Sequence, residues 1–446
     1  MIGLWPHAER IYFNFFKKYN IFPLVVIDLE SQKQKIESKL TKWKLSSQII
    51  RIYLPDEEKN LESLSEKTRK TLQKVLVTKN ITHAIIATEP KAHFAYSKFL
   101  IECGIHILCD KPITSPSHVI NTPEAALKIS SEYNELEKLL RRKNNLKFII
   151  QCQRRFHLWY KYIKEVCRNI IQKYNIPITY IDIFHNDGMW NMPNEFLERE
   201  NHPYKYWYWK LFHSWYHFVD LLTFFLEENK LCSEEKQINN CEMMCQVRCP
   251  KDFISNINLR DYLHLTGKEY NEKLFNIETY KWFWELDFFS MMNLNNKRWL
   301  ITHASINLLQ SGFSRRARTY LPENTYKGNG RVRHERINIH IWPLCNIQVH
   351  SYQAFEVKDR ALMDQYKPWW LEHFDIYIFK NVDIIGWKVV EHLTHKNIFG
   401  EWKKINHLWY NEDSREQCFL SFLYEDNTPS TLSEHRWTIK LLTEMY

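Results

Sequence analysis

Two histidines and an aspartate stand close together in the segment His213-Ser-Trp-Tyr-His217-Phe-Val-Asp220. If this segment is helical, residues at i and i+4 share one face, so both imidazoles would point the same way. An imidazole, whose ordinary pKa is about 6.5, can take up a hydroxyl proton at neutral pH. The same residues could instead bind a metal ion, or they could be polar side chains on a helix that faces another domain.

A second group of residues lies at the N-terminus, where Gly3-Leu4-Trp5-Pro6-His7-Ala8 has nearly the spacing of a dinucleotide-binding turn. In such a turn the pyrophosphate rests on backbone N–H groups at the start of a helix. Asp28 ends the next apolar run, where an acid binds ribose hydroxyls and favours NAD. Trp5 stands where the second glycine is expected. Only Met1-Ile2 precede the turn, so we predict that the first, central strand of the sheet is largely missing.

The segment from Ile85 to Pro112 carries further motifs. A strand ends in Ala87-Thr88, His93 follows at the start of a helix, and another strand ends in Asp110-Lys111-Pro112. This pattern resembles the Gfo/Idh/MocA family, the relatives of glucose–fructose oxidoreductase and inositol dehydrogenase, whose last motif reads Glu-Lys-Pro. The resemblance implies that Lys111 lies beside the nicotinamide and the substrate hydroxyl, where an ammonium would stabilise a developing alkoxide. It implies a cofactor-binding set of Gly3, Leu4, Trp5, Asp28, Thr88, His93, Asp110, Lys111 and Pro112.

The resemblance continues in the second half of the chain. Gln153-Arg154-Arg155-Phe156 lies where the family's chain enters its substrate domain. The segment from His213 to Asp220 matches the family's catalytic helix, which usually reads Asp-x-x-x-His-x-x-Asp. We therefore predict that Lys111, His217 and His213 are catalytic, with His217 as the acid/base group and His213 as a substrate ligand or proton relay. Arg154, Arg155 and Asp220 are expected to contact the substrate, and no metal site is expected.

Short apolar strands alternate with helices over the first 150 residues, which favours βαβ units and a buried parallel sheet. The predicted strands are Phe22–Asp28, Gln48–Leu54, Thr82–Thr88, Gly104–Cys109 and Lys147–Cys152. The predicted helices are Glu9–Tyr19, Leu61–Val77, Ala92–Cys103 and Pro123–Arg142.

Longer strand-like segments predominate after residue 151, which indicates a largely antiparallel sheet. They are Ile176–Asn186, Trp299–Leu309, Arg336–Phe355 and Phe374–Ile385, accompanied by helices at His157–Tyr174, His213–Leu226, Asp413–Leu423 and Leu432–Met445. We predict an α/β domain over residues 1–150, with a doubly wound parallel (Rossmann) sheet. An α+β domain with a broad, mostly antiparallel sheet is predicted over residues 151–446, serving substrate binding and oligomerisation.

The composition, with 44% apolar, 15% aromatic and 25% charged residues, is that of a globular protein. The net charge of +9 is mild for 446 residues, and no motif indicates binding to nucleic acid. No apolar run approaches the roughly 18 residues of a membrane span, and no secretion leader is expected. The ten cysteines form no paired framework, which favours a reducing cytoplasm.

Glycine and tryptophan occur in abnormal proportions. The chain has 9 glycines, whereas average use of about 7% would give about 31, and it has 17 tryptophans. Tryptophan stands where the family would have glycine at positions 5, 207, 209 and 215. We predict that these codons are UGA, read as glycine in the source organism; a genuinely tryptophan-rich chain is the alternative. An indole at position 5 would obstruct a pyrophosphate.

The sequence thus predicts an enzyme that transfers hydride between NAD and a sugar, polyol or related hydroxyl compound, at a cleft between two domains. NADP is left open as the cofactor. Two alternatives remain: a non-catalytic dinucleotide-binding sensor or scaffold, and a metal-dependent hydrolase built on His213, His217 and Asp220. We expect a small-molecule partner, no nucleic acid and no membrane, and we leave self-association into a homo-oligomer open.

Overall fold

The structure is a computed structural model of residues 1–446. It describes the chain except for residues 5–7, 46–48, 61, 144, 189, 192, 199–209, 282, 315–331, 355–372, 387, 395–396 and 398–409. The chain forms two compact units: unit 1 contains Met1–His157 with Asn406–Glu444, and unit 2 contains Leu158–Ile405. The division into domains 1–150 and 151–446 remains a prediction, to which the structure adds that the C-terminal segment packs within unit 1.

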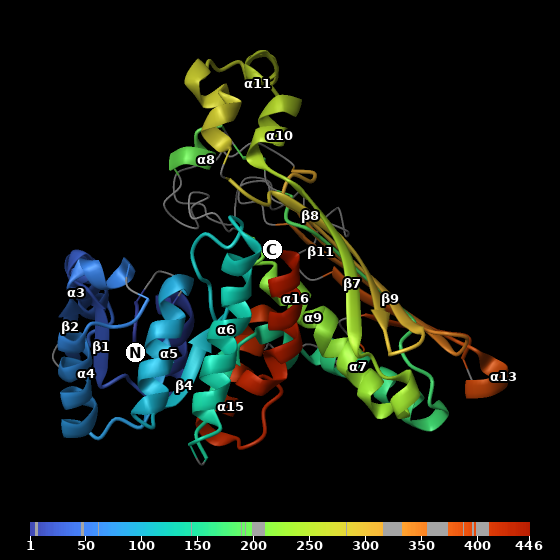
Figure 1. The fold of residues 1–446 in the computed structure, drawn as a ribbon, viewed down its shortest axis with the longest axis horizontal. Coiled ribbons are helices and arrows are strands. Elements are labelled where there is room, and N and C mark those ends of the chain that lie inside the picture. Colours follow the sequence, from blue (N-terminus) through green and yellow to red (C-terminus); the bar gives the residue numbers. More distant parts are fainter. Residues whose placement is uncertain are drawn as a thin grey trace. The chain divides into compact units, whose positions relative to one another are not determined.

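Unit 1 is built on parallel strands, as the alternating pattern predicted (Figure 1). The strands are β1 (Val25–Leu29), β2 (Ile50–Leu54), β3 (His83–Ile86), β4 (His106–Asp110) and β5 (Phe148–Gln151). β1 pairs with β2, and β4 pairs with both β3 and β5, always in parallel. Ile2 forms parallel bridges to Ile27 of β1 and to Ile86 of β3, so this residue occupies the place of a central strand.

The helices of unit 1 bury apolar stripes against these strands. They are η1 (Glu9–Phe13), α2 (Asn14–Tyr19), α3 (Lys33–Lys42), α4 (Glu66–Thr78), α5 (His93–Glu102) and α6 (Pro123–Leu140), followed from the C-terminal segment by α15 (Tyr410–Tyr424) and α16 (Arg436–Met445). α6 begins where expected, because Thr122 accepts a hydrogen bond from the backbone N–H of Ala125 and Pro123 is the first helical residue. η1, α2 and α15 share one apolar core, in which Phe15 and Phe16 pack against Phe419.

A cavity of about 260 Å³ lies in unit 1 near the N-terminal ends of β1 and β3. Its lining is mostly apolar and includes Met1, Val25 and Ala84. It lies at the opposite end of the strands from Asp28 and Asp110, where parallel sheets of this type bind their ligands. The cavity therefore marks the space beside the bridging residue Ile2 rather than a cofactor site.

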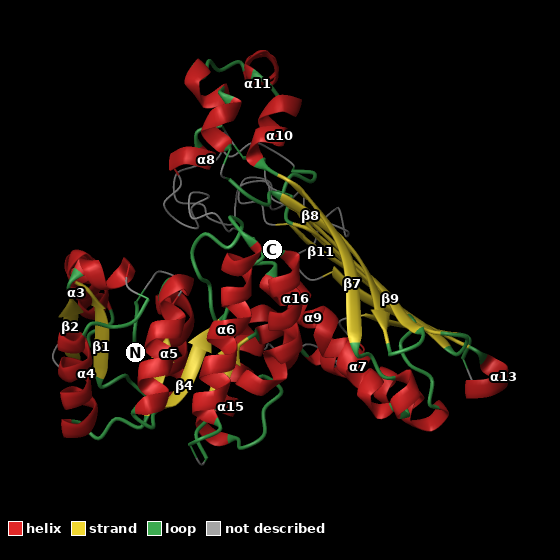
Figure 2. Cartoon of the chain, viewed as in Figure 1, coloured by secondary structure: helices red, strands yellow, loops and turns green. Residues whose placement is uncertain are grey.

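Unit 2 contains one eight-stranded sheet in the order β13-β12-β11-β10-β6-β9-β8-β7 (Figure 2). Every neighbouring pair is antiparallel except β6 with β9. The strands are β6 (Tyr180–Asn186), β7 (Asn240–Arg248), β8 (Asp287–Asn295), β9 (Leu300–Leu309), β10 (Val332–Ile341), β11 (Cys345–Ala354), β12 (His373–Lys380) and β13 (Val390–Thr394). The predicted broad, mostly antiparallel sheet is confirmed.

Helices α7 (Leu158–Tyr174) and α9 (Tyr216–Leu226) contact each other, and α9 also packs against β6. Ile181 and Ile183 of β6 are fully buried, as are Ile339 of β10 and Ile306 of β9. A smaller apolar cluster joins the short helices α8 (Glu195–Glu198), α10 (Pro250–Asn256) and α11 (Leu259–Thr266). Within the described ranges no helix is long and apolar enough to cross a bilayer.

Three details differ from the expectations for this unit. The predicted strand Arg336–Phe355 is a hairpin of β10 and β11, interrupted by a turn that contains Pro343, which has no N–H for a ladder. The predicted strand Phe374–Ile385 ends at Lys380 and is followed by the short helix α13 (Val382–Ile385). The predicted helix His213–Leu226 begins only at Tyr216.

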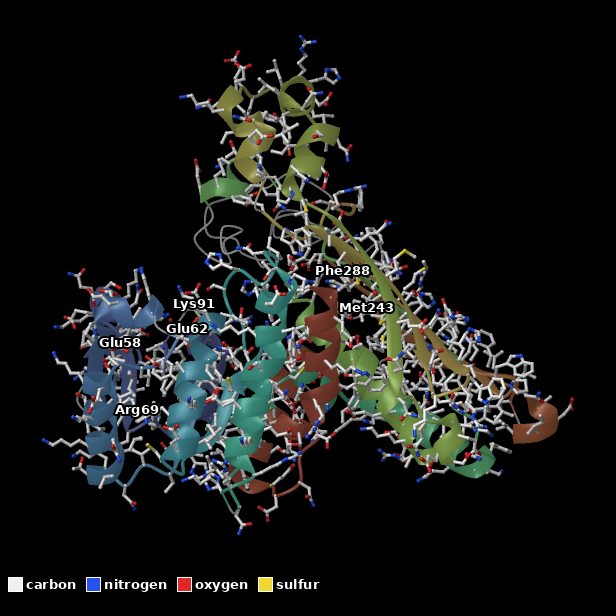
Figure 3. The ribbon with its side chains drawn as sticks, viewed as in Figure 1. Glu58, Glu62, Arg69, Lys91, Met243 and Phe288 are labelled. Atoms are coloured by element: carbon white, nitrogen blue, oxygen red, sulfur yellow. The ribbon has the colours of Figure 1, made fainter. Side chains whose placement is uncertain are left out.

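Strands β7, β8 and β13 were not predicted. β7 and β13 are the two edge strands of the described sheet, and none of their residues is buried, so they carry little apolar signal. Figure 3 labels Met243 of β7 and Phe288 of β8; the first is half-buried and the second fully buried.

Candidate nucleotide-binding and catalytic residues

Gly3 sits at a tight turn directly after the bridging residue Ile2. Its φ is +82°, and a Cβ atom at this position would lie 2.6 Å from the carbonyl oxygen of Ala87. The N–H of Gly3 donates to the carbonyl of Ile27 at 2.8 Å, and the N–H of Ala87 donates to that of Ile2 at 2.8 Å. Only glycine fits this conformation and this space, as expected for the first glycine of a dinucleotide turn. Trp5 lies outside the described residues.

Asp28, near the end of β1, closes the same turn. Its carboxylate accepts hydrogen bonds from the backbone N–H of Leu4 at 2.8 Å and of Leu29 at 2.9 Å. Lys39 of α3 donates to the carbonyl of Leu4 at 2.6 Å. Burial raises the pKa of Asp28, while the two N–H donors and Lys39 oppose that shift. The acid therefore lies beside the Gly3 turn, at the carboxyl end of a strand.

His93 joins the ends of two strands. Its ring is fully buried; Nδ1 lies 2.6 Å from the carbonyl oxygen of Pro112, and Nε2 lies 3.2 Å from that of Thr88. Burial lowers the pKa of His93 to about 4, against the effect of the two carbonyls. The ring thus ties the loop after β4 to the loop after β3, and its predicted contact with a cofactor stays a prediction.

Asp110 and Lys111 follow at the carboxyl end of β4. Burial raises the pKa of Asp110 to about 6, although a hydrogen bond from Tyr12 and the charges of Lys111 and Arg415 oppose the shift. Burial lowers the pKa of Lys111 to about 8, although Asp110 opposes the change. Perturbed acid and amine groups at a strand end are typical of reaction centres.

Tyr12 and Arg415, to which the sequence analysis gave no role, lie near Asp110 and Lys111. Tyr12 of η1 donates a hydrogen bond from its hydroxyl to Asp110 Oδ1 at 2.5 Å. Arg415 of α15 carries the second positive charge near Asp110 and forms an ion pair with Glu412 at 3.0 Å. Neither residue has a motif of its own, and the contact from Tyr12 spans 98 residues of sequence.

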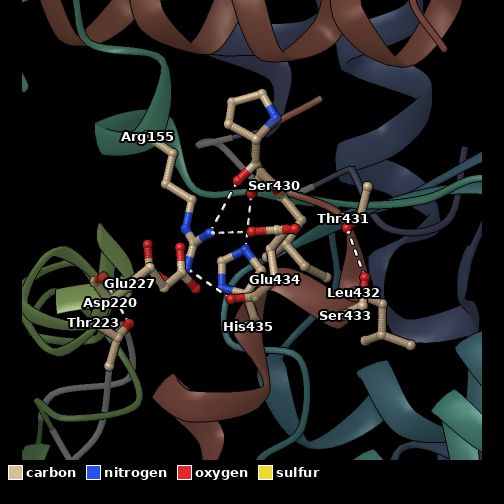
Figure 4. Close-up of polar contacts among 12 residues, drawn as sticks. Arg155, Asp220, Thr223, Glu227, Ser430, Thr431, Leu432, Ser433, Glu434 and His435 are labelled. Carbon is tan, nitrogen blue, oxygen red and sulfur yellow. Dashed lines mark hydrogen bonds and ion pairs between the residues drawn. The ribbon is translucent and has the colours of Figure 1, made fainter. Parts of the chain in front are cut away.

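Arg155, predicted to contact substrate, has partners in the C-terminal segment of unit 1 (Figure 4). Its guanidinium is fully buried and donates to the carbonyls of Pro429 and Glu434, each at 3.0 Å. Nearby, Ser430 Oγ lies 2.8 Å from His435 Nε2 and donates to the carbonyl of Ile150 at 2.7 Å. These bonds hold the C-terminal segment against β5. Arg154 is also buried, and the substrate roles of both arginines remain predictions.

In unit 2, the three predicted site residues lie at the start of α9. His213 precedes the helix in a turn, whereas His217 and Asp220 are helical, so the i, i+4 argument for a shared helix face does not apply to His213. All three side chains are buried or nearly so. Among the described residues, no group of three His, Cys, Asp or Glu side chains is placed to hold a metal ion. Nothing in this geometry therefore supports the hydrolase alternative.

A buried polar cluster packs against α9, and the sequence analysis did not identify it. The ring of His185 stacks on Phe218 of α9, with centroids 4.1 Å apart. Its Nε2 lies 3.3 Å from Asp187 Oδ1, and Asp187 also pairs with Lys210 at 2.5 Å and Arg333 at 3.3 Å. Burying these charges requires such pairing, and the cluster fixes the residue next to His217.

Trp215 lies between His213 and His217 in the sequence and is one of the tryptophans at a position where glycine is expected. Its side chain is fully buried. Its indole N–H has no hydrogen-bond partner among the described residues. Its φ of −81° does not require glycine. An indole N–H without a partner fits the hypothesis that this codon is UGA read as glycine. The backbone conformation, which any residue can adopt, gives that hypothesis no further support.

Comparison with known proteins gives a family match within unit 1 and a structural likeness over the whole chain. Residues 31–144 match the GFO_IDH_MocA family model, described as an oxidoreductase family with an NAD-binding Rossmann fold. None of the curated proteins compared matches the chain. The resemblance recognised in the sequence is confirmed over residues 31–144, which match the NAD-binding domain of the Gfo/Idh/MocA oxidoreductases.

Solved structures extend the likeness over the whole chain. Levoglucosan dehydrogenase in complex with NADH and levoglucosan is 12% identical, with a TM-score of 0.55, covering 100% of this chain and 94% of its own. UDP-N-acetylglucosamine 3-dehydrogenase from Acidithiobacillus ferrooxidans is also 12% identical, with a TM-score of 0.51 and coverage of 100% and 94%. The 3-ketoreductase KijD10 from Actinomadura kijaniata, in complex with NADP, is 8% identical, with a TM-score of 0.52 and coverage of 99% and 94%. At these identities the likeness shows the fold.

Proposed function

We propose that the chain oxidises or reduces a sugar or polyol hydroxyl, with NAD as the hydride carrier. The observation that supports this most is Lys111, whose amine follows Asp110 at the carboxyl end of β4 in a matched NAD-binding domain. Burial lowers the pKa of Lys111 to about 8, so the group is charged at neutral pH yet able to exchange a proton. The sugar class rests on two of the similar structures, levoglucosan dehydrogenase and UDP-N-acetylglucosamine 3-dehydrogenase.

The residues of unit 1 fit a nicotinamide dinucleotide. Gly3 lets the backbone turn where no Cβ has room, and the Asp28 carboxylate beside it suits the ribose hydroxyls. A bound nicotinamide would supply the hydride acceptor or donor. Thr88, Asp110 and Pro112 complete the strand-end surface that would receive it.

In the oxidation direction a hydride leaves the substrate carbon and a proton leaves its oxygen. The substrate C–H bond breaks and its electron pair leaves as hydride for the nicotinamide, while the substrate O–H proton goes to His217. Lys111, as an ammonium, stabilises the oxygen as negative charge develops on it. The product is a ketone or aldehyde, and reduction runs through the same groups in reverse.

The test is a turnover screen with sugars, polyols and sugar nucleotides, following NADH absorbance with NAD and NADP in parallel. Because Trp5 stands in the phosphate turn, the screen uses the chain as given and its Trp5→Gly variant. NAD-dependent oxidation of at least one sugar or polyol is expected. Tight dinucleotide binding without turnover of any compound would favour the sensor or scaffold alternative.

A further inference from the structure

Tyr12 is held in a fixed position by the core of unit 1. Its side chain is fully buried, and its ring stacks on Phe16 at 6.4 Å and lies at the same distance from Phe419 of α15. The hydroxyl at the end of this ring reaches Asp110 Oδ1 at 2.5 Å. A hydroxyl that donates to a carboxylate favours the charged form and fixes its orientation.

Arg415 of α15 lies at the same strand end, because Gln151 of β5, which pairs in register with Asp110, donates to the backbone carbonyl of Arg415 at 3.2 Å. That helix is anchored to the first helices by ion pairs from Arg10 to Glu412 at 3.0 Å and from Lys18 to Glu416 at 2.5 Å. The positive charge of Arg415 lowers the pKa of both Asp110 and Lys111. Cys109, Cys152 and Cys418 also lie near this pair, and burial raises the thiol pKa values of Cys109 and Cys418, so these two are neutral.

We propose that Tyr12 and Arg415 are positioning residues that hold Asp110 as an oriented carboxylate beside Lys111. The inference rests on the proposed function in one respect, that Lys111 is the amine which meets the substrate oxygen. Tyr12 supplies the hydrogen bond and Arg415 the charge, so the two residues act on the pair in distinguishable ways.

The two variants have different expected signatures. Tyr12→Phe removes a donor to the carboxylate, so the pKa of Asp110 should rise by about one unit. Asp110 would still be mostly ionised at pH 8, so the pKa of Lys111 should change by no more than a few tenths of a unit. Arg415→Gln removes a positive charge near both groups, so the pKa values of Asp110 and Lys111 should both rise, each by about one unit.

Both groups can be titrated without cofactor or substrate. The Asp110 carboxyl is followed by NMR of protein labelled with ¹³C at the aspartate carboxyls, with Asp110→Asn to assign the signal. Lys111 is followed by the pH dependence of its modification by acetic anhydride, quantified by mass spectrometry. Midpoints near 6 and near 8 are expected for the unaltered chain.

Tyr19→Phe is the matched control, because the Tyr19 hydroxyl also donates to a carboxylate, that of Glu416 at 2.5 Å, and joins α2 to α15 without contacting Asp110. It should move neither midpoint. Arg415→Lys keeps a positive charge and should return both midpoints toward those of the unaltered chain. The proposal is overturned if Tyr12→Phe leaves the Asp110 midpoint in place, or if Tyr19→Phe moves it equally.

The turnover profile supplies the second readout. If Asp110 must be ionised for Lys111 to act, the acid limb of kcat should move upward with the Asp110 midpoint in Tyr12→Phe, with little change in KM. The failure of this inference differs from the failure of the proposed function. A chain that turns over no sugar yet shows the expected midpoints overturns only the function, whereas unmoved midpoints in an active enzyme overturn only the role of Tyr12 and Arg415.

Discussion

The two units place their polar groups in different ways. In unit 1, strands β3, β4 and β5 are buried along most of their length, and the chemistry-bearing residues follow the strands at their carboxyl ends. In unit 2, the strands alternate between buried and accessible positions, and the predicted groups lie at the start of a helix held by a buried charge cluster. The candidate residues of unit 1 are therefore positioned by the strand topology, and those of unit 2 by packing against α9.

The largest expected effect is on the stability of unit 2. Asp187→Asn would leave Lys210 and Arg333 without the carboxylate that pairs with both. Breaking a buried ion pair by removing one partner costs about 3–5 kcal/mol. Thermal unfolding should show this loss, whereas Asp383→Asn on the exposed helix α13 should change little. An unchanged melting temperature in Asp187→Asn would mean that the cluster does not support α9.

The next effect compares one proposed catalytic residue from each unit. Lys111→Ala and His217→Ala should each lower kcat by at least about a hundredfold, the scale of a positioned proton-transfer group. Cofactor affinity should change much less. Steady-state kinetics on the substrate found by the screen provide the measurement, with Lys74→Ala and His264→Ala as surface controls. Near-native turnover in both site variants would refute the assigned chemistry.

A smaller effect is expected on cofactor choice. Asp28→Ala removes the carboxylate beside the Gly3 turn, so affinity for NAD should fall by about tenfold. Affinity for NADP should fall less, because the variant also removes a charge that repels the 2′-phosphate. Calorimetric titration with the two dinucleotides measures the ratio. An unchanged ratio would show that Asp28 does not face the ribose.

The smallest effect concerns the N-terminal amine of Met1, which donates to the carbonyl of Val25 at 2.7 Å. Burial lowers its pKa to about 5, from an ordinary value near 8. Between these pH values the unfolded chain binds more protons, so this amine should make stability rise from pH 5 to pH 8. N-terminal acetylation should remove the slope and stabilise the fold by about 1 kcal/mol at pH 7.

Denaturant unfolding at pH 6, 7 and 8 tests this sign. A second form, extended at the N-terminus by four apolar residues, should gain more than the acetylated chain, because its residues could also fill the neighbouring cavity. Equal stability of the acetylated and unmodified chains at pH 6 would contradict the effect of burial.

Much of the fold could be predicted because its signals are local. Apolar runs located the five strands that the structure describes in unit 1, and Thr122-Pro123 located the start of α6. The edge strands β7 and β13 could not be recognised, since neither face of either strand is buried. The turn at Pro343 divides a run that reads as one long strand, because alternation alone does not reveal where a hairpin reverses.

The candidate site was predictable only where motif and element coincide. Gly3, Asp28 and Lys111 lie at turns or strand ends whose positions follow from the chain pattern. Tyr12 and Arg415 do not, because they reach Asp110 from helices at opposite ends of the sequence. The His185–Asp187 cluster was missed for the same reason, since its partners come from separate strands and a loop.

The central claim is that unit 1 binds a nicotinamide dinucleotide at the Gly3–Asp28 turn. The most direct test is calorimetric titration of NAD into four proteins: the chain as given, Trp5→Gly, Asp28→Ala, and Trp5→Gly with Asp28→Ala. We predict measurable binding by Trp5→Gly, weaker binding by the chain as given, and about tenfold loss when Asp28→Ala is added to Trp5→Gly. No heat of binding from Trp5→Gly, or an affinity that Asp28→Ala leaves unchanged, would contradict the account.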